Sequence, residues 1–208
     1  MDPEILKIIF VVSALAVGLV AALVILRTRG HRRAQRLGTA FELGTSRPAG
    51  FLGSALDGLY RGYSCRYQVQ HASQYDRGGA SLRLAISSPH RWTAEVPNLA
   101  NKMLARFGLI SDLEIGDAEL DERLRFAAAE EGHLLAIFGS ESVRKAMQAL
   151  ASSDNFEAAR VRADRIDVRW SPRAPQLDET AEVLRVRLEL VTALLVACGY
   201  PPSHPPVA

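Results

Sequence analysis

The sequence predicts an α+β protein with one N-terminal transmembrane helix, followed by a small domain of antiparallel strands and hairpins with two or three packed helices. Three observations lead to this fold class: an uncharged run over residues 8–26, two pairs of alternating apolar and polar stretches, and a late stretch with apolar residues at helical spacing. Among 208 residues, 48% are hydrophobic and 23% are charged, which is typical of a globular chain and not of a disordered one.

The uncharged run predicts a membrane span over residues 5–26. The nineteen uncharged residues 8–26 alone would form a helix of roughly 28 Å, close to the hydrocarbon thickness of about 30 Å. The chain begins Met1-Asp2-Pro3-Glu4, without the basic start of a cleaved signal peptide. We therefore expect an uncleaved anchor, preceded by a short extracytoplasmic segment over residues 1–4.

Five arginines directly after the run predict its orientation. They are Arg27, Arg29, Arg32, Arg33 and Arg36. Because basic residues flank the cytoplasmic side of spans, the following domain should be cytoplasmic, and the cluster should contact anionic lipid headgroups. Residues 37–208 carry nineteen basic and twenty-one acidic side chains, so we expect no nucleic-acid partner.

Small residues recur every four positions within the run, at Ala14, Gly18 and Ala22. This spacing puts them on one side of a helix, where a partner helix could approach closely, although small residues are common in spans in any case. The run contains no His, Cys, Met, Asp or Glu, so it offers no ligand for a cofactor or metal and no proton path.

Residues 27–50 are predicted to form a basic juxtamembrane segment and linker, residues 51–199 the α+β domain, and residues 200–208 a proline-rich tail. Alternation predicts one hairpin from residues 63–69 and 82–86 and a second from residues 156–162 and 166–170. Residues 113–115 and 123–128 also look extended. Helices are predicted over residues 97–108 and 140–150, and over a final stretch capped by Asp178 and ended by Gly199.

Residues 112–122 hold six acidic side chains, which could bind a hard cation or supply an acid–base pair. An EF-hand loop is excluded because its sixth and twelfth positions would be Asp117 and Arg123. A solvated turn with Asp121 paired to Arg123 or Arg125 fits better.

The remaining candidate groups do not form a recognisable active site. His71, His90 and His133 have no nucleophile or carboxylate at a telling spacing, and Cys65 and Cys198 form neither a zinc motif nor a disulfide framework. Phosphate-cradling glycine motifs are absent from the sequence as well. We therefore expect no catalytic, cofactor-binding or metal-binding residue, and no enzyme activity.

The run Ile115–Phe126, following the Gly62-Tyr63 start of a strand, resembles a loose group of uncharacterised bacterial membrane-anchored proteins that carry a Gly-Asp-x-x-Phe-Asp turn. The resemblance covers residues 58–198, and Leu120 replaces the usual Phe. It implies a structural turn built on Gly116, Asp117 and Asp121, and a single-pass location in the bacterial inner membrane. The arginine cluster then orients the span, with the N-terminus outside and the domain cytoplasmic. The resemblance implies no activity.

Three functions remain open from the sequence. The first is a non-catalytic accessory or scaffold subunit of a larger integral membrane protein complex. The second is a free-standing, membrane-tethered binding module that recognises a soluble partner or anionic lipid through the arginine cluster and the sheet face. The third is an enzyme that uses the acids of residues 112–122, which predicts a metal-dependent thermal shift.

Overall fold

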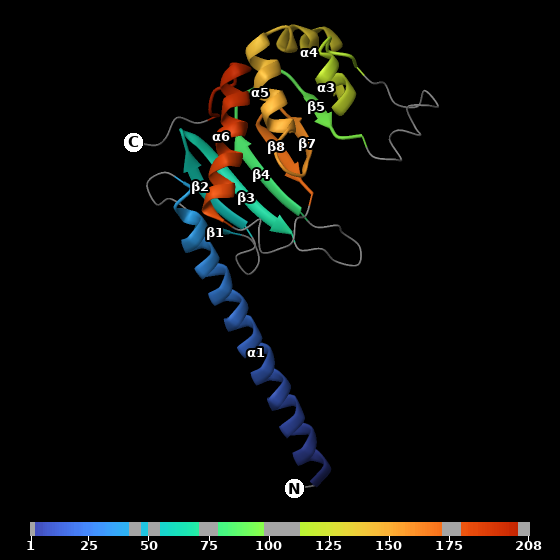
Figure 1. Cartoon of the computed structure of the whole chain (residues 1–208). Helices are drawn as coiled ribbons and strands as arrows, with labels where there is room; N and C mark the ends of the chain where they lie inside the picture. The colour runs from blue at the N-terminus through green and yellow to red at the C-terminus, as the bar shows by residue number, and fades with distance from the viewer. Residues whose placement is uncertain are drawn as a thin grey trace, which may run out of the picture.

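The structure is a computed structural model (Figure 1), and it describes residues 3–41, 47–49, 55–70, 79–97, 113–171 and 180–203. Element labels follow Figure 1. Five helices are described: α1 (Pro3–Gly38), α3 (Ala118–Arg123), α4 (Glu131–Phe138), α5 (Glu141–Ala151) and α6 (Ala181–Ala197).

Eight described strands form one sheet, in which every neighbouring pair is antiparallel. The spatial order is β1-β2-β3-β4-β8-β7-β5-β6. The strands are β1 (Arg47–Ala49), β2 (Ala55–Tyr60), β3 (Tyr63–Gln70), β4 (Gly79–Ala85), β5 (Trp92–Glu95), β6 (Arg125–Ala128), β7 (Phe156–Val161) and β8 (Arg165–Trp170). Consecutive strands β4 and β5 are separated in space by β8 and β7, so the C-terminal hairpin lies at the centre of the sheet.

One face of this sheet is covered by α5 and α6 (Figure 1). Alternation along the strands turns Tyr67, Leu82 and Val168 towards this layer, where all three are buried. Helix α6 contributes Leu188 and Val191, which are fully buried. This apolar layer is the core, and the opposite sheet face is therefore left to the polar residues of the same strands.

Both predicted hairpins are confirmed. Strand β3 pairs with β4, with Tyr67 opposite Leu82, and β7 pairs with β8, with Val161 opposite Ile166. The predicted helices over residues 140–150 and between Asp178 and Gly199 correspond to α5 and α6, and Thr180 caps α6. The predicted helix over residues 97–108 lies almost wholly outside the described residues. Asp178 also lies outside them.

The transmembrane helix predicted over residues 5–26 is wrong, and with it the single-pass location in the bacterial inner membrane. Those residues are not an element of their own, because α1 continues without a break through the arginine-rich segment as far as Gly38. Across the ranges that the structure describes, no helix has both the length and the apolar character that crossing a membrane requires.

The end of α1 is attached to the domain by a small apolar contact. Leu37 in the last turn of α1 is buried, and so are Ala40 and Phe41 directly after the helix. The Phe41 ring lies so close to Gly58 of β2 that a Cβ on this glycine would be 2.5 Å from it. The absence of a side chain at residue 58 therefore makes this contact possible.

Candidate functional site

The first candidate surface is the exposed part of α1, which extends away from the sheet (Figure 1). Its large apolar side chains are 51–69% exposed: Val12, Leu15, Val17, Leu19, Val20, Val24 and Ile25. At 100° per residue these positions are spread around the whole helix and not along one stripe. No element of the described domain covers them.

The predicted packing residues Ala14, Gly18 and Ala22 lie on this same stretch, and all three are exposed. A Cβ built on Gly18 would have no heavy atom within 4 Å. A larger residue at this position would therefore meet nothing within the described part of this chain.

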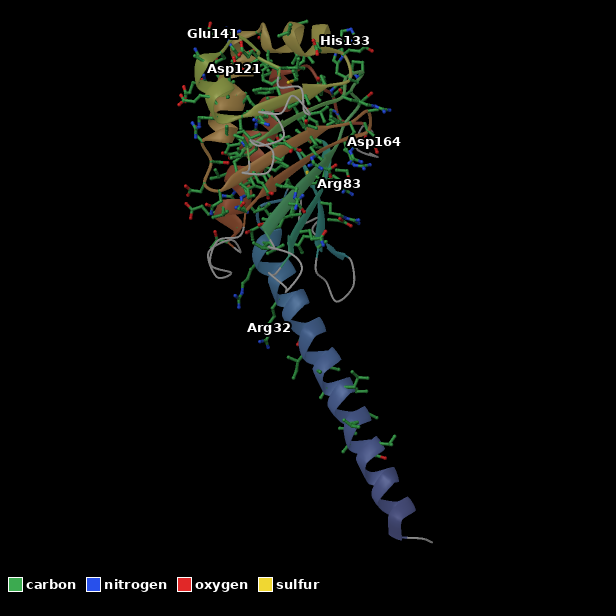
Figure 2. All side chains as sticks on the ribbon, turned by 90° about the vertical axis from the view of Figure 1, so that its right-hand side faces the viewer. Arg32, Arg83, Asp121, His133, Glu141 and Asp164 are labelled. Carbon is green, nitrogen blue, oxygen red and sulfur yellow. The ribbon has the colours of Figure 1, made fainter. Side chains whose placement is uncertain are left out.

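The predicted arginine cluster continues α1 towards the domain. Arg32, labelled in Figure 2, and Arg36 are exposed, while the side chains of Arg27, Arg29 and Arg33 are outside what the structure describes. The cluster is thus part of the helix itself and not of a flexible linker after it.

The predicted structural turn connects to α3. The Asp121 carboxylate accepts hydrogen bonds from the backbone N–H groups of Ile115, Gly116 and Asp117, at 2.9–3.1 Å. Asp117 caps α3 by accepting from the Leu120 N–H at 3.1 Å. Gly116 has φ +77°, a conformation that favours glycine.

The acids of this turn are used for local structure. Asp117 also accepts from Gln148 Nε2 at 3.2 Å, which ties the turn to α5. The ion pair predicted for Asp121 was to Arg123 or Arg125; in the structure Arg123 pairs with Glu119 instead, at 3.4 Å. Over the described ranges, no group of three or more His, Cys, Asp or Glu side chains is arranged to hold a metal ion.

A small pocket of about 250 Å³ lies where β5 and β6 meet the start of α4, and it brings together His90 and His133. Their ring centroids are 4.8 Å apart, and Glu130 Oε2 is 2.8 Å from His133 Nδ1. Among the described residues, the buried His90 Nδ1 has no hydrogen-bond partner. Sequence reasoning missed this pair because 43 positions separate the two residues; His71, considered with them, is not described.

The second candidate surface is the sheet face opposite α5 and α6, which carries six arginines on four strands and their connecting turn. We call it the arginine face; its members are Arg66, Arg83, Arg160, Arg162, Arg165 and Arg169. Figure 2 shows Arg83 on this sheet, with Asp164 at the turn between β7 and β8.

Strand register aligns part of this face in one row across the sheet. Asp57 lies opposite Arg66, Arg66 opposite Arg83, Arg83 opposite Asp167, and Asp167 opposite Arg160. At about 4.8 Å per strand, the four positions from β3 to β7 span about 14 Å. The Arg66–Arg83 pair places like charges directly opposite each other, an arrangement that costs stability unless anions lie nearby.

Carboxylates compensate part of this charge. Asp57 binds Arg66 through two hydrogen bonds, at 2.6 and 2.8 Å, and the Asp57 carboxylate raises the pKa of this guanidinium. Asp167 accepts from Arg83 Nε and from Arg165 Nε. These contacts are on side chains that remain partly exposed, so the arginines keep donor groups facing solvent.

Two hollows share the arginine face. One, of about 390 Å³, is lined by Arg66, Gln68, Ser81, Arg83, Arg160, Arg162, Arg165, Asp167 and Arg169. The other, of about 380 Å³, is lined by Asp57, Ser64, Cys65, Arg66, Arg83, Ala85, Asp164 and Arg165. Arg66, Arg83 and Arg165 thus line both hollows. The alternation of β3 alone indicated that Arg66 faces away from the core, but not which strands would lie beside it.

Comparisons with known proteins add little. No protein-family model matches the chain, and no curated protein matches it. Among solved structures, the crystal structure of the mycobacterial trehalose monomycolate transport factor A is weakly similar, with 12% identity and a TM-score of 0.43 over 86% of this chain and 98% of that one. A likeness at this level carries no argument about what this chain does.

Proposed function

We propose that the chain is a non-catalytic accessory subunit of a larger integral membrane protein complex, in which partner subunits cover the exposed part of α1 with apolar helices. The observation that supports this proposal is the set of seven large apolar side chains on α1 that are more than half exposed.

The size of this apolar surface argues for a partner. Fully burying a large apolar side chain stabilises by about 1.5–3 kcal/mol, so covering the exposed halves of seven would contribute on the order of 5–10 kcal/mol. Association itself costs an estimated 4–15 kcal/mol. The two ranges overlap, so a stable contact needs most of this surface to be covered.

The distribution of the apolar residues argues for several neighbours. A single partner helix covers one stripe, whereas the exposed side chains of α1 lie on all sides. Helices that are apolar all round are buried in larger assemblies. Integral membrane complexes provide partner helices with apolar surfaces, and the row of Ala14, Gly18 and Ala22 gives one of them a place for close approach.

The absence of enzyme activity is part of the proposal. The acids of the predicted turn are engaged with backbone N–H groups and with α5, so they support structure and not chemistry. Removing both Asp117 and Asp121 should lower the stability of the fold equally with and without divalent cations.

Photocrosslinking tests the partner contact directly. A photoreactive amino acid replacing Val17, which is 69% exposed, should crosslink to partner subunits in the cells that produce the protein. The matched control is Val196 on α6, which is 67% exposed, and crosslinks there should be far weaker. Equal crosslinking at the two positions would contradict the proposal, because α1 would then be no more than another exposed surface.

The effect of a larger residue on assembly is a second test. Full-length protein is extracted in mild detergent, and co-migrating subunits are identified by native gel and mass spectrometry. Gly18→Leu should release stoichiometric partners, whereas Gly132→Leu on α4 should not, although both glycines have no heavy atom within 4 Å of a built Cβ. A lone chain in wild type and both variants would refute the proposal.

A further inference from the structure

The arginine face has an arrangement that the accessory function does not require. Six arginines are collected by four strands and a turn that are distant in sequence, and the acids that line the same two hollows are Asp57, Asp164 and Asp167. Adding Glu95, which binds Arg160 at 2.7 Å, still leaves two more positive than negative charges. The face is therefore suited to an anionic ligand.

The centre of this face offers donors that the protein itself leaves available. Among described residues, the acceptor of Arg83 is Asp167, through Nε, which leaves its two Nη groups to the hollows. Arg169 has no carboxylate partner in the described part of the chain. Gln68 and Ser81 stand opposite each other in the adjacent row of the sheet, and Arg169 follows Ser81.

The donor geometry favours phosphate groups over carboxylates. On this face Asp57 binds Arg66 with both of its oxygens, and Asp167 uses one oxygen for Arg83 and the other for Arg165, so each carboxylate hydrogen-bonds at most two guanidinium groups. A phosphate presents at least three outward oxygens and can bridge guanidinium groups on neighbouring strands as well as the Ser81 hydroxyl. The opposed pair of Arg66 and Arg83 is the place where such a bridging anion would relieve repulsion.

Two neighbouring hollows that share three arginines indicate two anionic groups in one ligand. Each hollow, of 380–390 Å³, is in the size range of small-molecule sites. None of the lining side chains is aromatic, which disfavours single-stranded nucleic acid, because its bases stack on aromatic rings. The apolar lining consists of Cys65 and Ala85, too little to hold an acyl chain.

We propose that the two hollows form one binding site for a soluble ligand with two linked phosphate groups, with Arg66, Arg83 and Arg165 between them. This site is independent of the contact proposed for α1. Either proposal can therefore fail without the other.

Isothermal titration of the full-length protein with inorganic pyrophosphate tests the site. Pyrophosphate should bind more tightly than orthophosphate and more tightly than citrate, which carries carboxylates only. Arg83→Gln and, separately, Arg169→Gln should weaken pyrophosphate binding by about tenfold or more, as expected for the loss of charge-assisted hydrogen bonds. Lys145→Gln on α5 removes the same charge from another exposed ion pair and should leave binding unchanged.

Several results would overturn the assignment. Equal affinity for orthophosphate and pyrophosphate would contradict a two-group site, and equal affinity for citrate would contradict phosphate chemistry. Binding to phosphatidylglycerol vesicles without binding to soluble pyrophosphate would show a lipid surface instead. If Arg83→Gln lowers the unfolding midpoint, Arg169→Gln decides the outcome, and an effect no larger than that of Lys145→Gln would overturn the site.

Discussion

Helices α1 and α6 are both rich in apolar residues, but only α6 buries them within this chain. In α6, Leu184, Leu188, Val191 and Leu195 follow a four-three-four spacing and are fully buried. In α1 the side chains that the structure describes before Leu37 are exposed, and Leu37 is the first described one that is buried. A helix with one apolar stripe can be completed by a sheet, whereas a helix that is apolar on all sides needs more neighbours than one sheet face provides.

The largest expected difference between the two helices is in the cost of truncating a leucine. Leu188→Ala should lower the free energy of unfolding by about 2–5 kcal/mol, because it leaves a cavity under α6. Leu19→Ala, at a position that is 64% exposed on α1, should change it by less than about 0.5 kcal/mol. Urea unfolding followed by the fluorescence of the buried Trp92 and Trp170 measures both. Similar losses would mean that α1 packs on this chain's own domain.

The second prediction concerns the point where α1 meets the domain. Gly58→Ala should lower the free energy of unfolding by about 1–3 kcal/mol, because its methyl group would overlap the Phe41 ring. In a Phe41→Ala background the same change should cost less than about 0.5 kcal/mol. A double-mutant cycle of urea unfolding measures this coupling. If Gly58→Ala lowered the free energy of unfolding equally in the two backgrounds, overlap with the Phe41 ring would not be the reason why an alanine destabilises this position.

The sequence predicted those features of the two helices that depend on residues close together in the chain, and it missed those that depend on distant residues. The spacing of Leu184 to Cys198 predicted α6 because one sheet face completes it. The uncharged run before Arg27 predicted a helix, but α1 ends later than predicted, at Gly38. The polar residues after the run also favour a helix, and the longer helix places Leu37 where its side chain is buried. The residues around Leu37 did not indicate this buried position, because strand β2, about twenty residues later, helps to form it.

The same limit applies to the remaining elements and to the two candidate surfaces. The β3–β4 and β7–β8 hairpins join neighbouring stretches and were predictable, whereas β5 pairs with β7 across 63–69 positions and was missed. Helix α4 was missed because Gly132 and His133 interrupt its apolar pattern. The arginine face was unpredictable for a related reason: alternation gives the side of a strand, while the neighbour of Arg66 is decided by long-range register.

The third prediction compares thiols on the two helices. Burial raises the pKa of Cys198, just after α6, to about 12, so this thiol stays protonated and unreactive well above neutral pH. Ala16→Cys would put a thiol on the exposed part of α1. At pH 8, iodoacetamide should modify the α1 thiol about tenfold faster or more, as followed by peptide mass spectrometry. Between pH 9 and 10 the rate at Cys198 should still rise while that on α1 levels off; matching pH profiles would contradict the burial of Cys198.

The smallest expected change in stability comes from removing a hydrogen bond that an α6 side chain makes to the segment after α1. Arg185 Nη2 donates to the Thr39 carbonyl at 3.1 Å, and this contact is exposed to solvent. Arg185→Ala should therefore lower the free energy of unfolding by less than about 1 kcal/mol. Hydrogen exchange should nevertheless detect it locally: the amides of Ala40 and Phe41, which bond back to Leu37 and Gly38, should exchange faster, while those of α6 stay unchanged. Faster exchange throughout α6 would show that the end of α1 stabilises α6, and the two helices would then differ less than their burial indicates.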